Sequence, residues 1–174
     1  MKIAIGSDHC GVELKVALVK ALGEVATVED VGTADATSCD YTDYAIAVAK
    51  AVAAGDVDFG VLVCKTGIGM SMTANRFQNV RAAICTTKDD AVVTRQHNGA
   101  NVLCLGADKV SAADAVEIAK TFLGTAASDD ERHARRRWKL ERAQRLSDCS
   151  GLMHDDPEVF AAIEAQTKQE DAEI

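Results

Sequence analysis

The chain has 174 residues, 48% of them apolar, which is enough for one globular domain with a buried core. Its formal net charge of -8 predicts that the protein as a whole repels nucleic acid and anionic membranes. No apolar run approaches the roughly 18 residues of a membrane span, and the N-terminus lacks a signal-peptide core, so we expect a cytoplasmic protein.

Short runs rich in β-branched residues alternate with amphipathic stretches from the N-terminus to about residue 125. The runs predict strands at 2–7, 26–31, 59–64, 81–86 and 101–105. The stretches between and after them predict helices at 11–22, 42–53, 69–76, 88–96 and 111–123. This alternation is typical of right-handed βαβ units. We therefore predict an α/β fold with a doubly wound, five-stranded parallel sheet, Rossmann-like with a flavodoxin-like strand order, which binds ligands at the carboxyl ends of its strands.

A basic segment follows this core. Ser128 to Glu131 has the form of a capping box and predicts a helix that runs to about Leu146. Arg132 and Arg136 are four residues apart on one face of that helix, and such a pair can clamp a phosphate. The alternative is that these arginines form a solvated charged face. RNA binding by this helix is a third possibility, but it needs aromatic side chains and Trp138 is the one aromatic residue in the helix.

The C-terminal residues are predicted to lie outside the main domain. Asp156 and Pro157 form a good N-cap and first-turn pair for a last helix that ends near Gln169. We expect residues 1–146 to form one domain and residues 147–174 to form a helical extension or tail.

The six cysteines are at positions 10, 39, 64, 85, 104 and 149. They form no CxxC pair and no cysteine–histidine group at zinc spacing, so we expect neither a disulfide framework nor a cysteine metal site. Cys85 and Cys104 lie inside apolar runs and are predicted to be buried as small hydrophobic groups.

The stretch VLVCKTGIGMS at 61–71 can be compared with three loop motifs that bind phosphate or nucleotides. A nucleotide P-loop would need glycines where Phe59 and Cys64 stand. A cysteine phosphatase loop would need an arginine at the position of Met70 to clamp phosphate oxygens. A dinucleotide fingerprint would need a third glycine at Met72. All three are therefore disfavoured.

Cys64 is predicted to end a strand directly before a helix N-terminus. Backbone amides there point at a bound anion, and the helix dipole together with Lys65 favours a thiolate. A thiolate beside an oxyanion site suits removal of a proton from a carbon next to a carbonyl. The alternative is that Cys64 only fills core space. The predicted anion hole consists of Gly67, Ile68, Gly69, Met70 and Ser71.

Two other acid or histidine positions lie at strand or helix ends. Asp8 and His9 follow the first strand and should reach the same sheet edge as Cys64, although Asp8 could instead be a helix N-cap. His97 and Asn98 end the fourth helix and fall at the opposite, amino edge. They could serve only the site of a neighbouring subunit, and the alternative for His97 is a helix C-cap.

Five motifs resemble the ribose-5-phosphate isomerase type B family, which also contains galactose-6-phosphate isomerase subunits. The resemblance covers about residues 1–145. It implies interconversion of aldose and ketose phosphates through an enediolate, with neither metal nor organic cofactor, in a homodimer or homotetramer whose active sites lie between subunits. The motifs are GSDHCGVELK at 6–15, DYTDYA at 40–45, CKTGIGMSMTANR at 64–76, RQHNGANVLCLGA at 95–107 and ERHARR at 131–136.

The resemblance also implies roles for individual residues. Cys64 would be the base that moves the proton between C1 and C2, and Thr66, with the amides at 67–71, would stabilise the enediolate. Asp8 and His97 would help to open the sugar ring. The phosphate would be bound by His9, Arg132 and Arg136, and the sugar hydroxyls by Asp40, Tyr41 and Asn98.

The chain departs from the family pattern at a few positions. Lys65 replaces a glycine, Gly99 an aspartate and Thr42 a proline, and Asp108-Lys109 stands where an arginine is common. These departures bear on the sugar more than on the reaction. Our leading hypothesis is isomerisation of ribose 5-phosphate to ribulose 5-phosphate. The alternatives are an isomerase of erythrulose 4-phosphate, allose 6-phosphate or galactose 6-phosphate, a non-catalytic sugar-phosphate sensor, and an RNA-binding module.

Overall fold

The computed structural model describes residues 1–148 and, beyond them, only positions 158, 161, 162, 165 and 169. Among the described residues, no helix is both long enough and apolar enough to cross a membrane. The elements in chain order are β1 (Lys2–Ser7), α1 (Val12–Leu22), β2 (Thr27–Asp30), α2 (Tyr41–Ala54), β3 (Phe59–Cys64), α3 (Ile68–Ala74), β4 (Ala82–Ile84), α4 (Lys88–Asn98), β5 (Val102–Gly106), α5 (Ala112–Gly124) and α6 (Glu131–Asp148).

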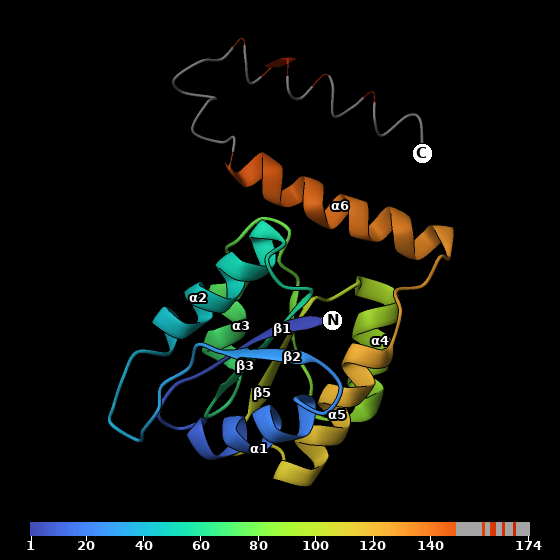
Figure 1. Ribbon diagram of the computed structural model, residues 1–174. Helices are drawn as coiled ribbons and strands as arrows, with labels where there is room; N and C mark the ends of the chain where they lie inside the picture. Colours follow the sequence, from blue (N-terminus) through green and yellow to red (C-terminus); the bar gives the residue numbers. More distant parts are fainter. Residues whose placement is uncertain (149–157, 159–160, 163–164, 166–168, 170–174) are drawn as a thin grey trace. The chain divides into compact units, whose positions relative to one another are not determined.

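The five strands form one parallel sheet in the order β2-β1-β3-β5-β4 (Figure 1). The predicted fold class is confirmed. The order begins as in flavodoxin, with β2-β1-β3, but β5 rather than β4 lies beside β3, so the last two strands are exchanged. The register pairs Ser7 with Val63 and Cys64 with Gly106, which brings the carboxyl ends of β1, β3 and β5 together.

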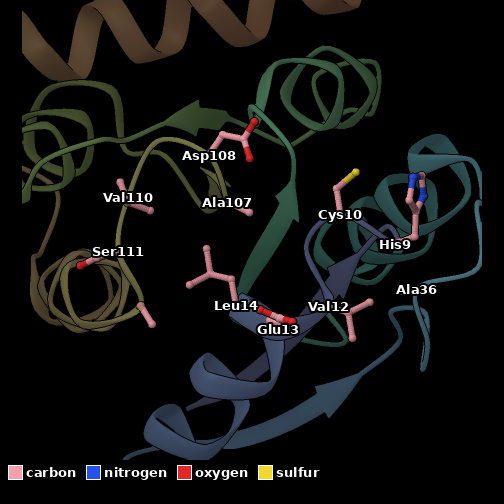
Figure 2. Close-up of a pocket in the computed structure, with 11 residues that line it drawn as sticks. His9, Cys10, Val12, Glu13, Leu14, Ala36, Ala107, Asp108, Val110 and Ser111 are labelled. Atoms are coloured by element: carbon pink, nitrogen blue, oxygen red, sulfur yellow. The ribbon is translucent and has the colours of Figure 1, made fainter.

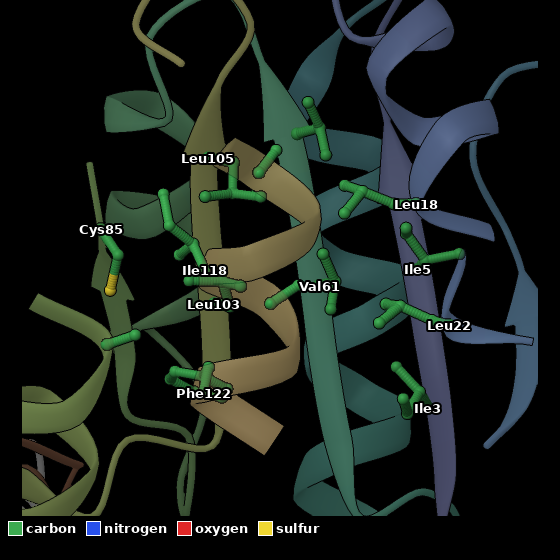
Figure 3. Close-up of a cluster of buried hydrophobic side chains, with 14 of the residues drawn as sticks. Ile3, Ile5, Leu18, Leu22, Val61, Cys85, Leu103, Leu105, Ile118 and Phe122 are labelled. Atoms are coloured by element: carbon green, nitrogen blue, oxygen red, sulfur yellow. The ribbon is translucent and has the colours of Figure 1, made fainter. Parts of the chain in front are cut away.

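The central strands β1, β3 and β5 are buried on both faces because helices cover both sides of the sheet. Alternate residues of β3 face opposite sides: Val61 and Val63 join the cluster under α1 and α5, whereas Leu62 and Cys64 join the cluster under α2 and α3. Figure 3 shows the first cluster, in which Phe122 fills the space over β5. Cys85 and Cys104 are fully buried, as predicted.

The start of α6 differs from the sequence prediction. Ser128 is not the cap: its N–H donates to the carbonyl of Gln96 at 3.0 Å, and the helix begins at Glu131. Asp130 takes the capping position, because its Oδ1 accepts the N–H of Arg132 at 2.9 Å. That backbone hydrogen bond holds the pKa of Asp130 below its ordinary value. The predicted cap at 156–157 lies outside the described residues.

The chain divides into two compact units, residues 1–128 and residues 129–174. The first contains the sheet and its five covering helices, and the second contains α6. Within α6 the guanidinium of Arg142 lies over the ring of Trp138, 5.8 Å from its centroid. The division between the two units falls at residue 128, and the expected domain boundary at residue 146 stays a prediction from the sequence.

Candidate active site

The site begins where the loops after β1, β3 and β5 meet. The N–H of Asp8 donates to the carbonyl of Val63 at 3.3 Å, and the N–H of Ala107 donates to the carbonyl of Cys64 at 2.9 Å. After β1 the chain continues into α1 on one face of the sheet, and after β3 it continues into α3 on the other. The structure thus places Asp8 and Cys64 at neighbouring strand tips, at the kind of switch point where α/β sheets bind ligands.

The thiol of Cys64 lies directly under the turn into α3. Its side chain is buried, with 5% of the residue exposed, and its Sγ accepts the N–H of Gly67 at 3.1 Å. Gly67 has a φ of +80°, in the left-handed region that glycine adopts without strain. A Cβ at this position would also lie 3.2 Å from the carbonyl carbon of Leu105. The glycine therefore lets the chain reverse closely enough to donate a hydrogen bond to sulfur.

The amides at the start of α3 are not equally available to an anion. Ile68 N–H lies 3.4 Å from Oγ1 of Thr66, and Ser71 N–H donates to the carbonyl of Gly67 at 3.0 Å. Within residues 1–148, no acceptor contacts the amides of Gly69 and Met70. Of the predicted anion hole, these two first-turn amides are the ones left open to an incoming oxygen.

The aromatic ring of Tyr41 covers this turn. A Cβ on Gly69 would lie 2.6 Å from two ring carbons of Tyr41, so the absence of a side chain at 69 is what lets the ring pack there. Asp40 occupies the N-cap position of α2, yet its side chain makes no capping hydrogen bond. Of these two residues, Tyr41 packs directly against the thiol loop.

Asp8 orders the turn after β1. Its carboxylate is buried, and Oδ1 accepts the N–H groups of Cys10 at 3.0 Å and Gly11 at 3.1 Å. The N-cap of α1 is Gly11 rather than Asp8, so the alternative of a simple helix cap does not hold. The bonds to Oδ1 fix the orientation of the carboxylate at the edge of the crevice.

His9 is held by the loop before α2. Its Nδ1 accepts the N–H of Cys39 at 3.2 Å, and the Cys39 sulfur lies 3.8 Å from the same nitrogen. A backbone N–H can only donate, so the proton of the neutral ring is on Nε2, which can donate in turn to an oxygen of a ligand. The contact with Cys39 joins distant parts of the chain, and the sequence analysis missed it because no spacing motif signals it.

Metal binding is a second use to consider at this corner. The ligand atoms of Asp8, His9 and Cys10 lie within 4.8 Å of one another, which makes them a possible cation site among the described residues. However, Nδ1 of His9 is engaged by a backbone amide and Nε2 carries the proton, so neither nitrogen presents a free lone pair. The donor set therefore fits an oxygen anion or a hydroxyl better than a metal ion.

A pocket of about 860 Å³ opens beside His9, between the first turns of α1 and α5 (Figure 2). Partial desolvation raises the pKa of the exposed Cys10 thiol, and the charge of Asp8 raises it further, while Lys65 acts in the opposite direction. No motif in the sequence predicts this pocket. It is lined by His9, Cys10, Val12, Glu13, Leu14, Ala36, Ala107, Asp108, Val110, Ser111 and Ala112.

Four predicted site residues belong to other parts of the chain. His97 and Asn98 end α4, which leads through Gly99 into the amino end of β5, so they lie at the edge opposite Cys64, as predicted. Arg132 and Arg136 belong to α6, in the second unit of the chain. The first unit therefore supplies the thiol, the amides, Asp8, His9 and Tyr41 at one edge of the sheet, and His97 and Asn98 at the other.

Comparisons with known proteins identify the family of this chain. The family model for Ribose/Galactose Isomerase matches residues 3–140. Ribose-5-phosphate isomerase B of Escherichia coli is 43% identical over 136 residues, which cover 78% of this chain and 91% of that protein. A putative sugar phosphate isomerase of Bacillus subtilis is 41% identical and covers 72% of this chain and 85% of its own length.

Solved structures give the same result. The type B ribose 5-phosphate isomerase of Trypanosoma brucei superposes with a TM-score of 0.79 at 42% identity, over 82% of this chain and 97% of that one. The ribose 5-phosphate isomerase of Thermotoga maritima superposes with a TM-score of 0.78 at 44% identity, over 81% and 97%. This chain belongs to the ribose/galactose isomerase family.

Proposed function

We propose that the protein is an aldose–ketose isomerase that interconverts ribose 5-phosphate and ribulose 5-phosphate through an enediolate. The observation that carries the proposal is the Cys64 thiol, which accepts a hydrogen bond from Gly67 at 3.1 Å beside the open amides of Gly69 and Met70. Relatives named ribose-5-phosphate isomerase B, at about 40% identity over most of the chain, support the choice of substrate.

The reaction needs one base and one site for negative charge. The Cys64 thiolate takes the proton from C2 of the open-chain aldose, and the electron pair moves into an enediolate whose oxygen accepts the amides of Gly69 and Met70. The hydroxyl of Thr66 carries a proton between the oxygens on C1 and C2. The Cys64 thiol then returns its proton to C1, which completes the ketose and regenerates the thiolate.

Substrate binding draws on more than one chain in this proposal. Asp8 at the tip of β1 and His97 from a second copy open the furanose ring. His9 donates from Nε2 to the phosphate, together with Arg132 and Arg136 of the second copy.

A homodimer or homotetramer with shared sites would bring these groups together, since His97 lies at the amino edge of its own sheet. Asp40, Tyr41 and the second copy's Asn98 contact the sugar hydroxyls. We place the enzyme in the cytoplasm, acting on a soluble metabolite.

The direct test is turnover of a panel of aldose phosphates with four, five and six carbons. We expect wild-type protein to prefer ribose 5-phosphate, and Cys64→Ala to lose activity by several orders of magnitude. Cys85→Ala is the matched control, because it removes a fully buried thiol that the site does not use. Turnover of none of these sugars would refute the isomerase and favour a sugar-phosphate sensor.

Shared sites are tested by mixing two inactive proteins. Cys64→Ala and His97→Ala variants are each inactive alone, but hybrid assemblies contain one intact site and should regain part of the activity. Native mass spectrometry would verify that hybrids form. If hybrids form and no activity returns, His97 does not serve a neighbouring site.

A further inference from the structure

Lys65 and Asp108 form an ion pair between the loops that follow β3 and β5. Lys65 Nζ lies 3.8 Å from Oδ2 of Asp108, and the N–H of Asp108 donates to the carbonyl of Lys65 at 3.1 Å. A Cβ on Gly106 would lie 2.8 Å from the carbonyl carbon of Thr66, so the two loops approach as closely as their backbones allow. The side chains of Lys65 and Asp108 are therefore held next to each other, in the loops that follow β3 and β5.

The pocket beside His9 carries negative charge of its own. Glu13 and Asp108 line it together with His9 and Cys10, and no lysine or arginine is among its lining residues within the described chain (Figure 2). The charges of Lys65 and Asp108 both act on the Cys10 thiol at the pocket wall, in opposite directions. Lys65 is thus a cation within electrostatic reach of a pocket whose own charged walls are carboxylates.

This pair contributes little to folding. Its side chains are 67% and 55% exposed, and ion pairs with that exposure add almost nothing to stability. Its effect on a ligand is larger, because a sugar phosphate that reaches His9 enters the same pocket as Asp108. Two like charges would then face each other at short range, unless a cation offsets one of them.

We propose that Lys65 is a specificity-determining residue that neutralises Asp108 and thereby admits phosphorylated rather than neutral sugars to the site. The inference rests on the proposed function for its substrate class. Lys65 acts through Asp108 and does not itself hold the phosphate. Removing the charge of Lys65 should therefore weaken the binding of phosphorylated substrates if Asp108 is charged. It should have little effect on their binding if the charge of Asp108 has also been removed.

A double-mutant cycle tests the proposal with Lys65→Met, Asp108→Asn and the two combined. Lys65→Met should raise the KM for ribose 5-phosphate about tenfold. It should lower kcat/KM for ribose 5-phosphate by a larger factor than kcat/KM for unphosphorylated ribose, because any loss of thiolate at Cys64 would affect both sugars alike. The combined variant should recover to within about threefold of wild type, because the unpaired Asp108 carboxylate is no longer there to repel the phosphate. Full loss in the combined variant would show direct phosphate contact and overturn the proposal.

Lys88→Met is the matched control. Lys88 pairs with Glu117 at the same 3.8 Å, with side chains 59% and 62% exposed, and neither residue lines the pocket. Lys88→Met should leave the KM for ribose 5-phosphate unchanged. An equal rise of the KM in Lys65→Met and Lys88→Met would show that only the net charge of the protein matters.

Equilibrium binding of inorganic phosphate by calorimetry separates this proposal from the isomerase assignment. Binding should weaken about tenfold in Lys65→Met and return in the combined variant even if no sugar is turned over. Unchanged phosphate binding in Lys65→Met, or no phosphate binding by wild type, would overturn the proposal.

Discussion

Gly67 is the position where backbone geometry and catalysis are most directly linked, and Gly67→Ala separates them from general stability. A left-handed φ of +80° costs an L-residue about 1–2 kcal/mol. The added Cβ would also lie 3.2 Å from the carbonyl carbon of Leu105, so the turn must shift by a few tenths of an ångström. That shift moves the Gly67 N–H away from the Cys64 sulfur, to which it donates at 3.1 Å.

Gly55 provides a control with the same strain and none of the crowding. Its φ is +77°, and a Cβ there would meet nothing within 4 Å. We expect both alanine variants to lose about 1 kcal/mol or slightly more in urea unfolding, with the larger loss at Gly67.

Only Gly67→Ala should lower kcat/KM, by about ten- to hundredfold, as expected for the loss of a charge-assisted hydrogen bond worth about 1.5–3 kcal/mol. Full activity in Gly67→Ala, or equal losses of activity in both variants, would refute this reasoning.

Three further predictions concern stability and thiol chemistry. Hydrogen bonds from Thr86 and Thr87 hold the pKa of Asp90 below its ordinary value of 3.8. Asp90→Ala should therefore cost about 1 kcal/mol at neutral pH, and the cost should shrink as the pH falls through the lower folded-state pKa; a cost independent of pH would contradict this. Burial raises the pKa of Cys104, so iodoacetamide should label exposed Cys10 in the native protein and Cys104 only after unfolding, as site-resolved mass spectrometry would show. Gly60→Ala places a Cβ 2.6 Å from Cγ1 of Val48 and should destabilise the fold by about 1–3 kcal/mol; unchanged thermal stability would mean that α2 can shift freely.

The sequence predicted the central strands better than the edge strands. The bounds of β1 and β3 match the predictions, because both are continuous apolar runs that the sheet buries on both faces. β4 is shorter than predicted, spanning only Ala82–Ile84, since an edge strand pairs on one side only. The exchange of the last two strands depends on long-range packing that no local pattern records.

The site divides in the same way into local and distant features. Cys64 and Gly67 were found from sequence because the strand end, the turn and the helix start are contiguous. The hydrogen bond from Cys39 to His9 and the ion pair between Lys65 and Asp108 join separate loops, so only the fold reveals them. Residues that a second copy would supply cannot be located from one chain at all.

The central claim is that Cys64 moves a proton at carbon, and solvent exchange tests it most directly. Ribose 5-phosphate is incubated with the protein in deuterated water, and deuterium at C1 of ribulose 5-phosphate is followed by NMR. We predict incorporation with wild-type protein and with Cys85→Ala, and none with Cys64→Ala. Undiminished turnover and undiminished deuterium incorporation by Cys64→Ala would contradict Cys64 as the base.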